Sequence, residues 1–135
     1  MILDVEKAVI DYLTSNMSSI VGTGNESVEI YRYYFPDDAD PEAITVHDEL
    51  PSADSDVPEI NLDGIRIIVR SARPDTAFKM IQNIDLLLDK MVRIVFNSEV
   101  ECCLCSRNSG PDRLPGEGNS LEHYQALYSM TLRAQ

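Results

Sequence analysis

The sequence predicts an α+β domain in which a mostly antiparallel sheet of about four to five strands is packed by two helices. Three observations carry this prediction. Short runs rich in β-branched and aromatic residues recur along the chain, turn-forming residues separate most of them, and a single long amphipathic segment lies between them. The length of 135 residues suits one domain, spanning residues 1–135, in the predicted order α-β-β-β-α-β-β.

The first helix is predicted from Asp4 to about Met17. Apolar residues at Val5, Val9 and Leu13 recur with the spacing of one helical face. Asp4 suits the N-cap position because its carboxylate can accept from the first free backbone amides.

Ser27–Phe35 is rich in β-branched and aromatic residues and is predicted to be a strand. Tyr31 and Tyr33 would lie on one face and Val28 and Ile30 on the other. Because both faces are partly apolar, we expect a cover on both sides, and a partner subunit could supply the second one.

The charge is concentrated in one stretch. The formal net charge is −12, and ten of the 23 acidic residues lie at about 36–63, where there is no Lys or Arg. Four of the seven prolines fall there too, which predicts a solvated acidic excursion interrupted by one short strand at Ala43–His47. The acidity argues against sequence-specific or general nucleic-acid binding and against an anionic membrane, since both need a basic surface.

Ile65–Ser71 is predicted to be a strand with an apolar face of Ile65, Ile67 and Val69 and an opposite face that carries arginines. A helix is predicted to follow from Pro74 to Met91, because proline fits the first turn of a helix.

The last third of the chain is predicted to contain short strands at Val92–Phe96 and Glu99–Cys105, an irregular segment at Ser106–Ser120, and a final strand at Leu121–Arg133.

No constellation for catalysis, cofactor binding or metal binding is predicted. Cys102, Cys103 and Cys105 lack zinc-site spacing, and we interpret them as small hydrophobic residues, with Cys103 and Cys105 on one strand face and Cys102 on the other. His47 and His123 have no nucleophile motif beside them, so the chain is predicted not to be an enzyme.

The sequence also lacks an apolar run of bilayer length and the pattern of a signal peptide. The cysteine usage fits a reducing compartment.

A candidate subunit interface follows from the segregated charge. The plain interpretation of the arginine face is a solvated sheet surface, and the sharper one is a head-to-tail contact between copies of the chain. The residues proposed for this contact are Arg66, Arg70, Arg73, Asp37, Asp38, Asp40, Asp54, Asp56, Tyr31 and Tyr33.

Two segments, IRIIVRSARPDTAFKMIQNIDLLLDK and SGPDRLPGEGNSLEHYQALYSMTLR, resemble the minor capsid proteins of tailed bacteriophages and prophages, which are similar to tail terminators. An arginine-punctuated strand leads into a helix with Ala77 early and Ile84–Leu88 late. A Gly-Pro segment at 110–119 and a final strand closing at Tyr128–Arg133 complete the resemblance.

The resemblance implies a non-enzymatic ring protein of the virion neck, usually a hexamer, assembled in the bacterial cytoplasm. Its implied partners are further copies of itself, the tail tube protein and the head–tail connector or stopper. Two alternatives stay open: a monomeric acidic module that mimics nucleic acid or inhibits a basic protein, and a small α+β enzyme.

Overall fold

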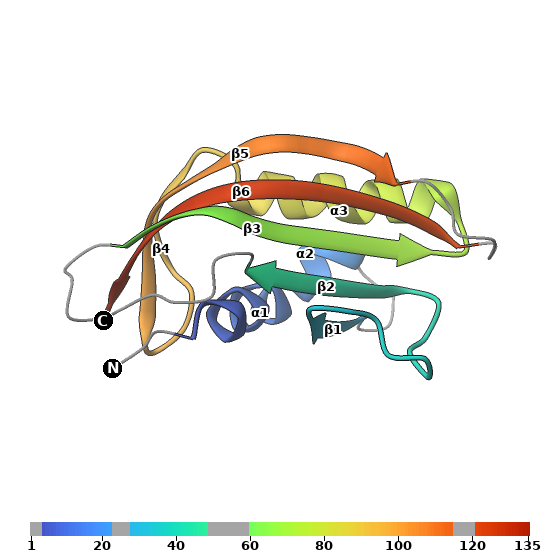
Figure 1. The fold of residues 1–135 in the computed structure, drawn as a ribbon, viewed down its shortest axis with the longest axis horizontal. Coiled ribbons are helices and arrows are strands. Elements are labelled where there is room, and N and C mark those ends of the chain that lie inside the picture. Colours follow the sequence, from blue (N-terminus) through green and yellow to red (C-terminus); the bar gives the residue numbers. More distant parts are fainter. Residues whose placement is uncertain (1–3, 23–27, 49–59, 115–120) are drawn as a thin grey trace.

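The computed structural model describes residues 4–22, 28–48, 60–114 and 121–135 (Figure 1). Six strands form one sheet in the order β1-β2-β3-β6-β5-β4, where only the β1–β2 pair is parallel in this described part of the chain. The α+β class is confirmed, but the described residues form six strands and three helices, more than predicted. The elements are α1 Val5–Ser15, α2 Met17–Val21, β1 Glu29–Arg32, β2 Ala43–Asp48, β3 Ile60–Ser71, α3 Pro74–Leu88, β4 Met91–Val95, β5 Val100–Leu114 and β6 Glu122–Ala134.

The predicted first helix is divided in two. Asp4 is the N-cap of α1, as predicted, and its carboxylate accepts from the Lys7 backbone amide at 3.1 Å. Asn16 ends α1 with a non-helical backbone, and its side-chain amide donates to the Tyr12 carbonyl at 2.9 Å. The apolar stripe of α1 is buried as the periodicity predicted.

β1 is shorter than the predicted strand Ser27–Phe35. The prediction of a strand is wrong for the residues after Arg32. Tyr33 has a φ of 69°, a left-handed conformation that cannot continue a strand. Its backbone amide still donates to the carbonyl of Val46 at 3.1 Å, so the chain turns away directly after its last contact with β2.

Within the acidic excursion at 36–63, the predicted strand Ala43–His47 is confirmed as β2, which continues to Asp48 and is buried between β1 and β3, with only His47 partly exposed. The end of the excursion is wrong. β3 already begins at Ile60 and passes Asp63-Gly64 through a register shift between Leu62 and Ile65. The connection at 36–42 is therefore the described remainder of the excursion, and residues 49–59 lie outside the described part.

α3 begins at Pro74, as predicted, but ends at Leu88 instead of Met91. Asp89 is extended, and Lys90 has a φ of 61°, so the chain leaves the helix and enters β4 at Met91. The side chains of Ala77, Met80, Ile81, Ile84 and Leu88 are buried against the sheet.

β5 continues to Leu114, so the irregular segment predicted at Ser106–Ser120 is wrong for residues 106–114. This half of β5 pairs with β6 through two register shifts, and Gly110 has a φ of 87°. Bulges thus let a Gly-Pro sequence remain in the sheet.

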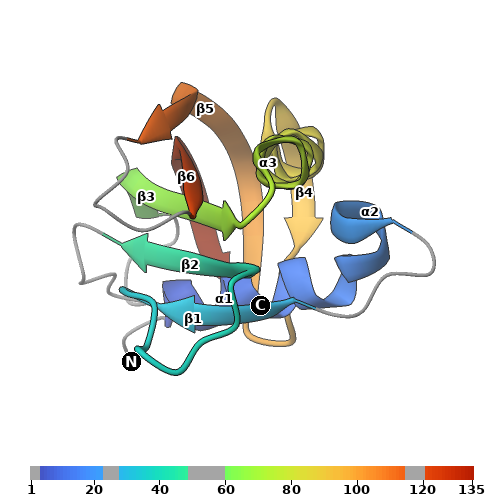
Figure 2. The same cartoon turned by 90° about the vertical axis from the view of Figure 1, so that its right-hand side faces the viewer.

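The helices pack on one face of the curled sheet, and the opposite face is left open by them (Figure 2). The core lies between these layers and includes Ile65, Ile67, Tyr128, Met130 and Leu132, all at most 1% exposed. Within the described segments, no helix is long and apolar enough to span a membrane.

Candidate subunit interface

Arg70 extends from the open face of β3 and holds the acidic connection at 36–42 within its own subunit. Its Nη2 donates to the backbone carbonyls of Ala39 and Asp40, at 3.2 and 2.8 Å. The guanidinium lies over the ring of Phe35, 4.3 Å from the centroid. Because Arg70 donates to backbone carbonyls, this contact does not pair it with the carboxylates of the connection.

The other two predicted arginines are placed differently. Arg66 lies on the same face of β3 as Arg70 and is partly buried, whereas Arg73 is exposed at the N-cap of α3. Arg73 borders an open groove of about 880 Å³ between α2, the 40–42 segment and the first turns of α3. Its walls mix Arg73 and Lys79 with Asp40 and Glu42, so neither sign of charge dominates the groove.

Of the acids and tyrosines predicted for the interface, the structure places only some on the same segment. Asp37, Asp38 and Asp40 are exposed on the connection after β1, while Asp54 and Asp56 lie outside the described residues. Tyr31 is partly exposed and pairs with Thr45 across β1 and β2. Tyr33 does not share a strand with Tyr31, since β1 has already ended there.

Both histidines contact aromatic rings. His47 meets the ring of Tyr33 edge-on, with centroids 4.9 Å apart, and His123 meets the ring of Phe35 at 5.8 Å. Across the residues the structure describes, no three His, Cys, Asp or Glu side chains are grouped so that they could hold a metal ion.

A surface at β4 was missed by sequence reasoning. β4 is an edge strand, and every one of its residues except Ile94 is exposed. Val92 and Val95 are 61% and 56% exposed, and Leu104, the partner of Val92 on β5, is 49% exposed. The alternation at 92–96 predicted a strand, but no local signal distinguishes an edge strand from a covered one.

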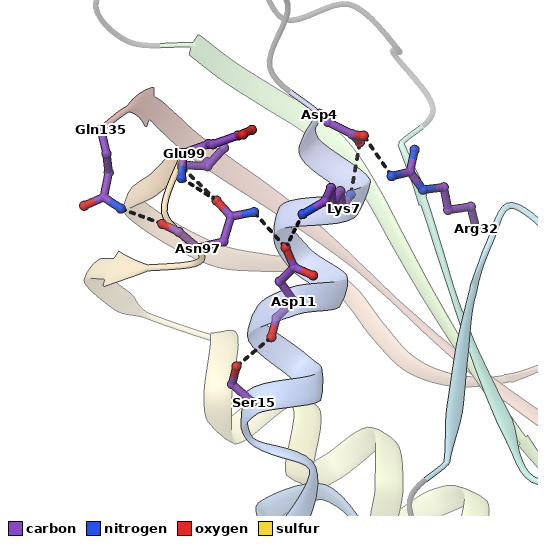
Figure 3. Close-up of polar contacts among 9 residues, drawn as sticks. Asp4, Lys7, Asp11, Ser15, Arg32, Asn97, Glu99 and Gln135 are labelled. Carbon is purple, nitrogen blue, oxygen red and sulfur yellow. Dashed lines mark hydrogen bonds and ion pairs between the residues drawn. The ribbon is translucent and has the colours of Figure 1, made fainter.

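The β4–β5 turn is tied to α1 by a polar network (Figure 3). Asn97 donates from Nδ2 to Asp11 at 2.9 Å, and its Oδ1 accepts from the backbone amides of Glu99 and Val100, each at 2.9 Å. Asp11 also pairs with Lys7 at 2.9 Å, and these two contacts lower the pKa of its carboxyl group. The base of β4 is therefore held in a fixed position relative to the helices.

A second network joins α3 to the middle of the sheet. The buried hydroxyl of Tyr128 donates to Asp85 Oδ1 at 2.9 Å, and Arg107 donates to Asp85 Oδ2 at 2.7 Å. Burial and the neighbouring Asp85 carboxylate raise the pKa of Tyr128 above its usual value. Asp89 accepts from the Arg107 backbone amide at 2.9 Å, which fixes β5 against the end of the helix.

The cysteines correct the predicted register of β5. Cys102 and Cys105 are both buried on the helix-facing side, whereas Leu104 is exposed. The register shift between Cys102 and Leu104 inserts the residue that breaks the simple alternation. Interaction between the two thiols lowers the pKa of Cys102 and raises that of Cys105, which burial raises further.

No known protein family and no curated protein sequence matches the chain. Among solved structures, it is similar to a protein in a structure described as "Virion of native gene transfer agent (GTA) particle". The superposition has a TM-score of 0.55 and covers 88% of this chain and 84% of that chain, at 11% sequence identity. At that identity the likeness establishes the fold: the described sheet and its helices form an architecture that a protein of that virion particle shares.

Proposed function

We propose that this protein is a non-enzymatic structural subunit of a phage-like virion. The observation that carries the proposal is the similarity, over 88% of the chain, to a protein of a gene transfer agent virion. The resemblance of two sequence segments to phage minor capsid proteins depends only on their residues, so it supports the same class independently of the fold.

The more specific proposal is a tail terminator. In this role the protein forms a ring, with six subunits as in the family it resembles, caps the tail tube and joins it to the head connector or stopper. Two features support assembly with copies of itself: among the described residues no further strand pairs with either outer strand of the sheet, β1 or β4, and exposed apolar side chains lie on β4.

The ring is tested by light scattering coupled to size-exclusion chromatography. At micromolar concentration we expect a single species of about six times the chain mass of 15.1 kDa, either alone or after purified tail tube protein is added. A 15.1 kDa monomer at low and moderate salt, with and without tail tube protein, would contradict the proposal. A monomer that instead captures a basic protein would favour the acidic binding module.

A further inference from the structure

The exposed edge at β4 combines apolar side chains with two cations. We call it the β4 surface and define it as Lys90, Val92, Arg93, Val95 and Leu104. Lys90 and Arg93 have φ values of 61° and 56°, so the backbone bends on both sides of Val92. Both cations are exposed, and neither forms an ion pair with any residue in the described ranges.

The lack of an acidic partner sets Lys90 and Arg93 apart from the arginines on the neighbouring strands. Arg107, Arg113 and Arg133 pair with Asp85, Glu122 and Glu101, at 2.7, 2.6 and 2.9 Å. The cations on β5 and β6 are therefore paired within the subunit, while the β4 surface carries two positive charges that no described residue pairs and the exposed apolar side chains of Val92, Val95 and Leu104.

The complementary surface lies on the connection that follows β1, the strand at the other edge of the sheet. We call it the β1 surface and define it as Tyr33, Tyr34, Asp37, Asp38 and Asp40. Tyr33 and Tyr34 are 48% and 71% exposed, and the three carboxylates are exposed on the residues that follow them in the chain. In the described part of the chain, none of these carboxylates pairs with a cation.

Arg70 makes the β1 surface an ordered one. Its two bonds to the carbonyls of Ala39 and Asp40, and its stacking on Phe35, fix the connection without neutralising the acids. The β4 surface is fixed as well, through Asn97 and its bond to Asp11. Two ordered surfaces lose little conformational entropy when they meet.

We propose that the β4 surface of one subunit docks on the β1 surface of a second copy of this chain, head to tail. The two surfaces match in charge and in apolar content, whereas a two-fold contact centred on either surface alone would set cation against cation or acid against acid. β4 and the strand before the β1 surface, β1, are the two outer strands of one curled sheet (Figure 2), so each subunit can engage two neighbours. This inference rests on the proposed function and names the contact that builds the ring.

Charge reversal tests the contact. The first variant carries Lys90→Glu and Arg93→Glu, and the second carries Asp37→Lys and Asp38→Lys. Each variant alone faces like charges across the contact, so we expect its apparent subunit dissociation constant to rise at least about tenfold. An equimolar mixture restores opposite charges at both contacts and should assemble again into alternating rings.

The control is Lys79→Glu with Gln82→Glu, which makes a similar charge change at exposed positions of α3 outside both surfaces and should leave assembly unchanged. Circular dichroism confirms that all variants fold. If the unmodified chain assembles, alone or on tail tube protein, but the first variant assembles equally well or the mixture does not recover, the contact is wrong while the proposed function stands. If the unmodified chain assembles under neither condition, both are overturned.

Discussion

Replacing Asp85 by alanine is expected to lower the free energy of unfolding by about 3 kcal/mol. The carboxylate accepts from the hydroxyl of Tyr128, whose side chain is 0% exposed, and from Arg107. Without it, a buried hydroxyl loses its partner and an arginine on β5 loses its ion pair. Urea unfolding at a fixed protein concentration measures the loss, because association would otherwise contribute to the apparent stability.

The control is Asp75→Ala, on the exposed first turn of the same helix, which should cost clearly less. Adding Tyr128→Phe to Asp85→Ala removes the buried hydroxyl that has lost its acceptor, and should recover about 1 kcal/mol or more of the lost stability. A loss below about 1 kcal/mol for Asp85→Ala, or no recovery in the double variant, would show that this network does not hold α3 on the sheet.

Replacing Gly110 by alanine is expected to cost about 3 kcal/mol for two reasons that act together. Its φ of 87° is a conformation that residues with a side chain rarely adopt. A Cβ there would also lie 2.5 Å from the backbone oxygen of Gln125 and 3.0 Å from the Cα of Ala126, both on β6. Because these are backbone atoms of the paired strand, the steric overlap can be relieved only if β5 moves away from β6.

Gly22→Ala is the comparison for backbone conformation. Gly22 has a similar φ of 83°, with a ψ of 165°, but lies exposed at the end of α2, where we expect backbone strain alone to cost about 1 to 2 kcal/mol. Chemical denaturation measures the free energy of unfolding of both variants, and the difference between their losses gives the cost of the steric contact of Cβ with β6. Equal losses at the two positions would mean that the close approach of β6 to Gly110 does not contribute to the loss of stability.

The parts of the fold that the sequence predicts correctly are those where the signal is local. Asp4 and Pro74 begin helices because their side chains suit a helix start whatever lies beyond. Ile65, Ile67 and Val69 are buried because strict alternation in a strand leaves one face to the core.

The errors arise where pairing with a distant strand overrides a local signal. Gly110-Pro111 is typical of a loop, yet β6 keeps this segment in the sheet through register shifts. Cys102 and Cys105 share a face because a bulge adds a residue between them, and no sequence pattern marks that bulge.

The candidate subunit interface stays a prediction, and the structure shows only where its described residues lie. Segregated charge identified the acids at 37–40, which the structure exposes on an ordered connection. It also pointed to Arg70, which the structure shows in contact with its own subunit. Lys90 and Arg93 could not be selected, because their exposure depends on β4 being the outermost strand, a property of the whole sheet.

Electron microscopy of tail tubes assembled with and without this protein is the direct test of the proposed terminator role. We expect a single closed ring of this chain at one end of each tube, and tubes that stop growing once the ring is bound. Tubes that elongate unchanged with bare ends, or chain bound along the walls of the tube, would contradict it.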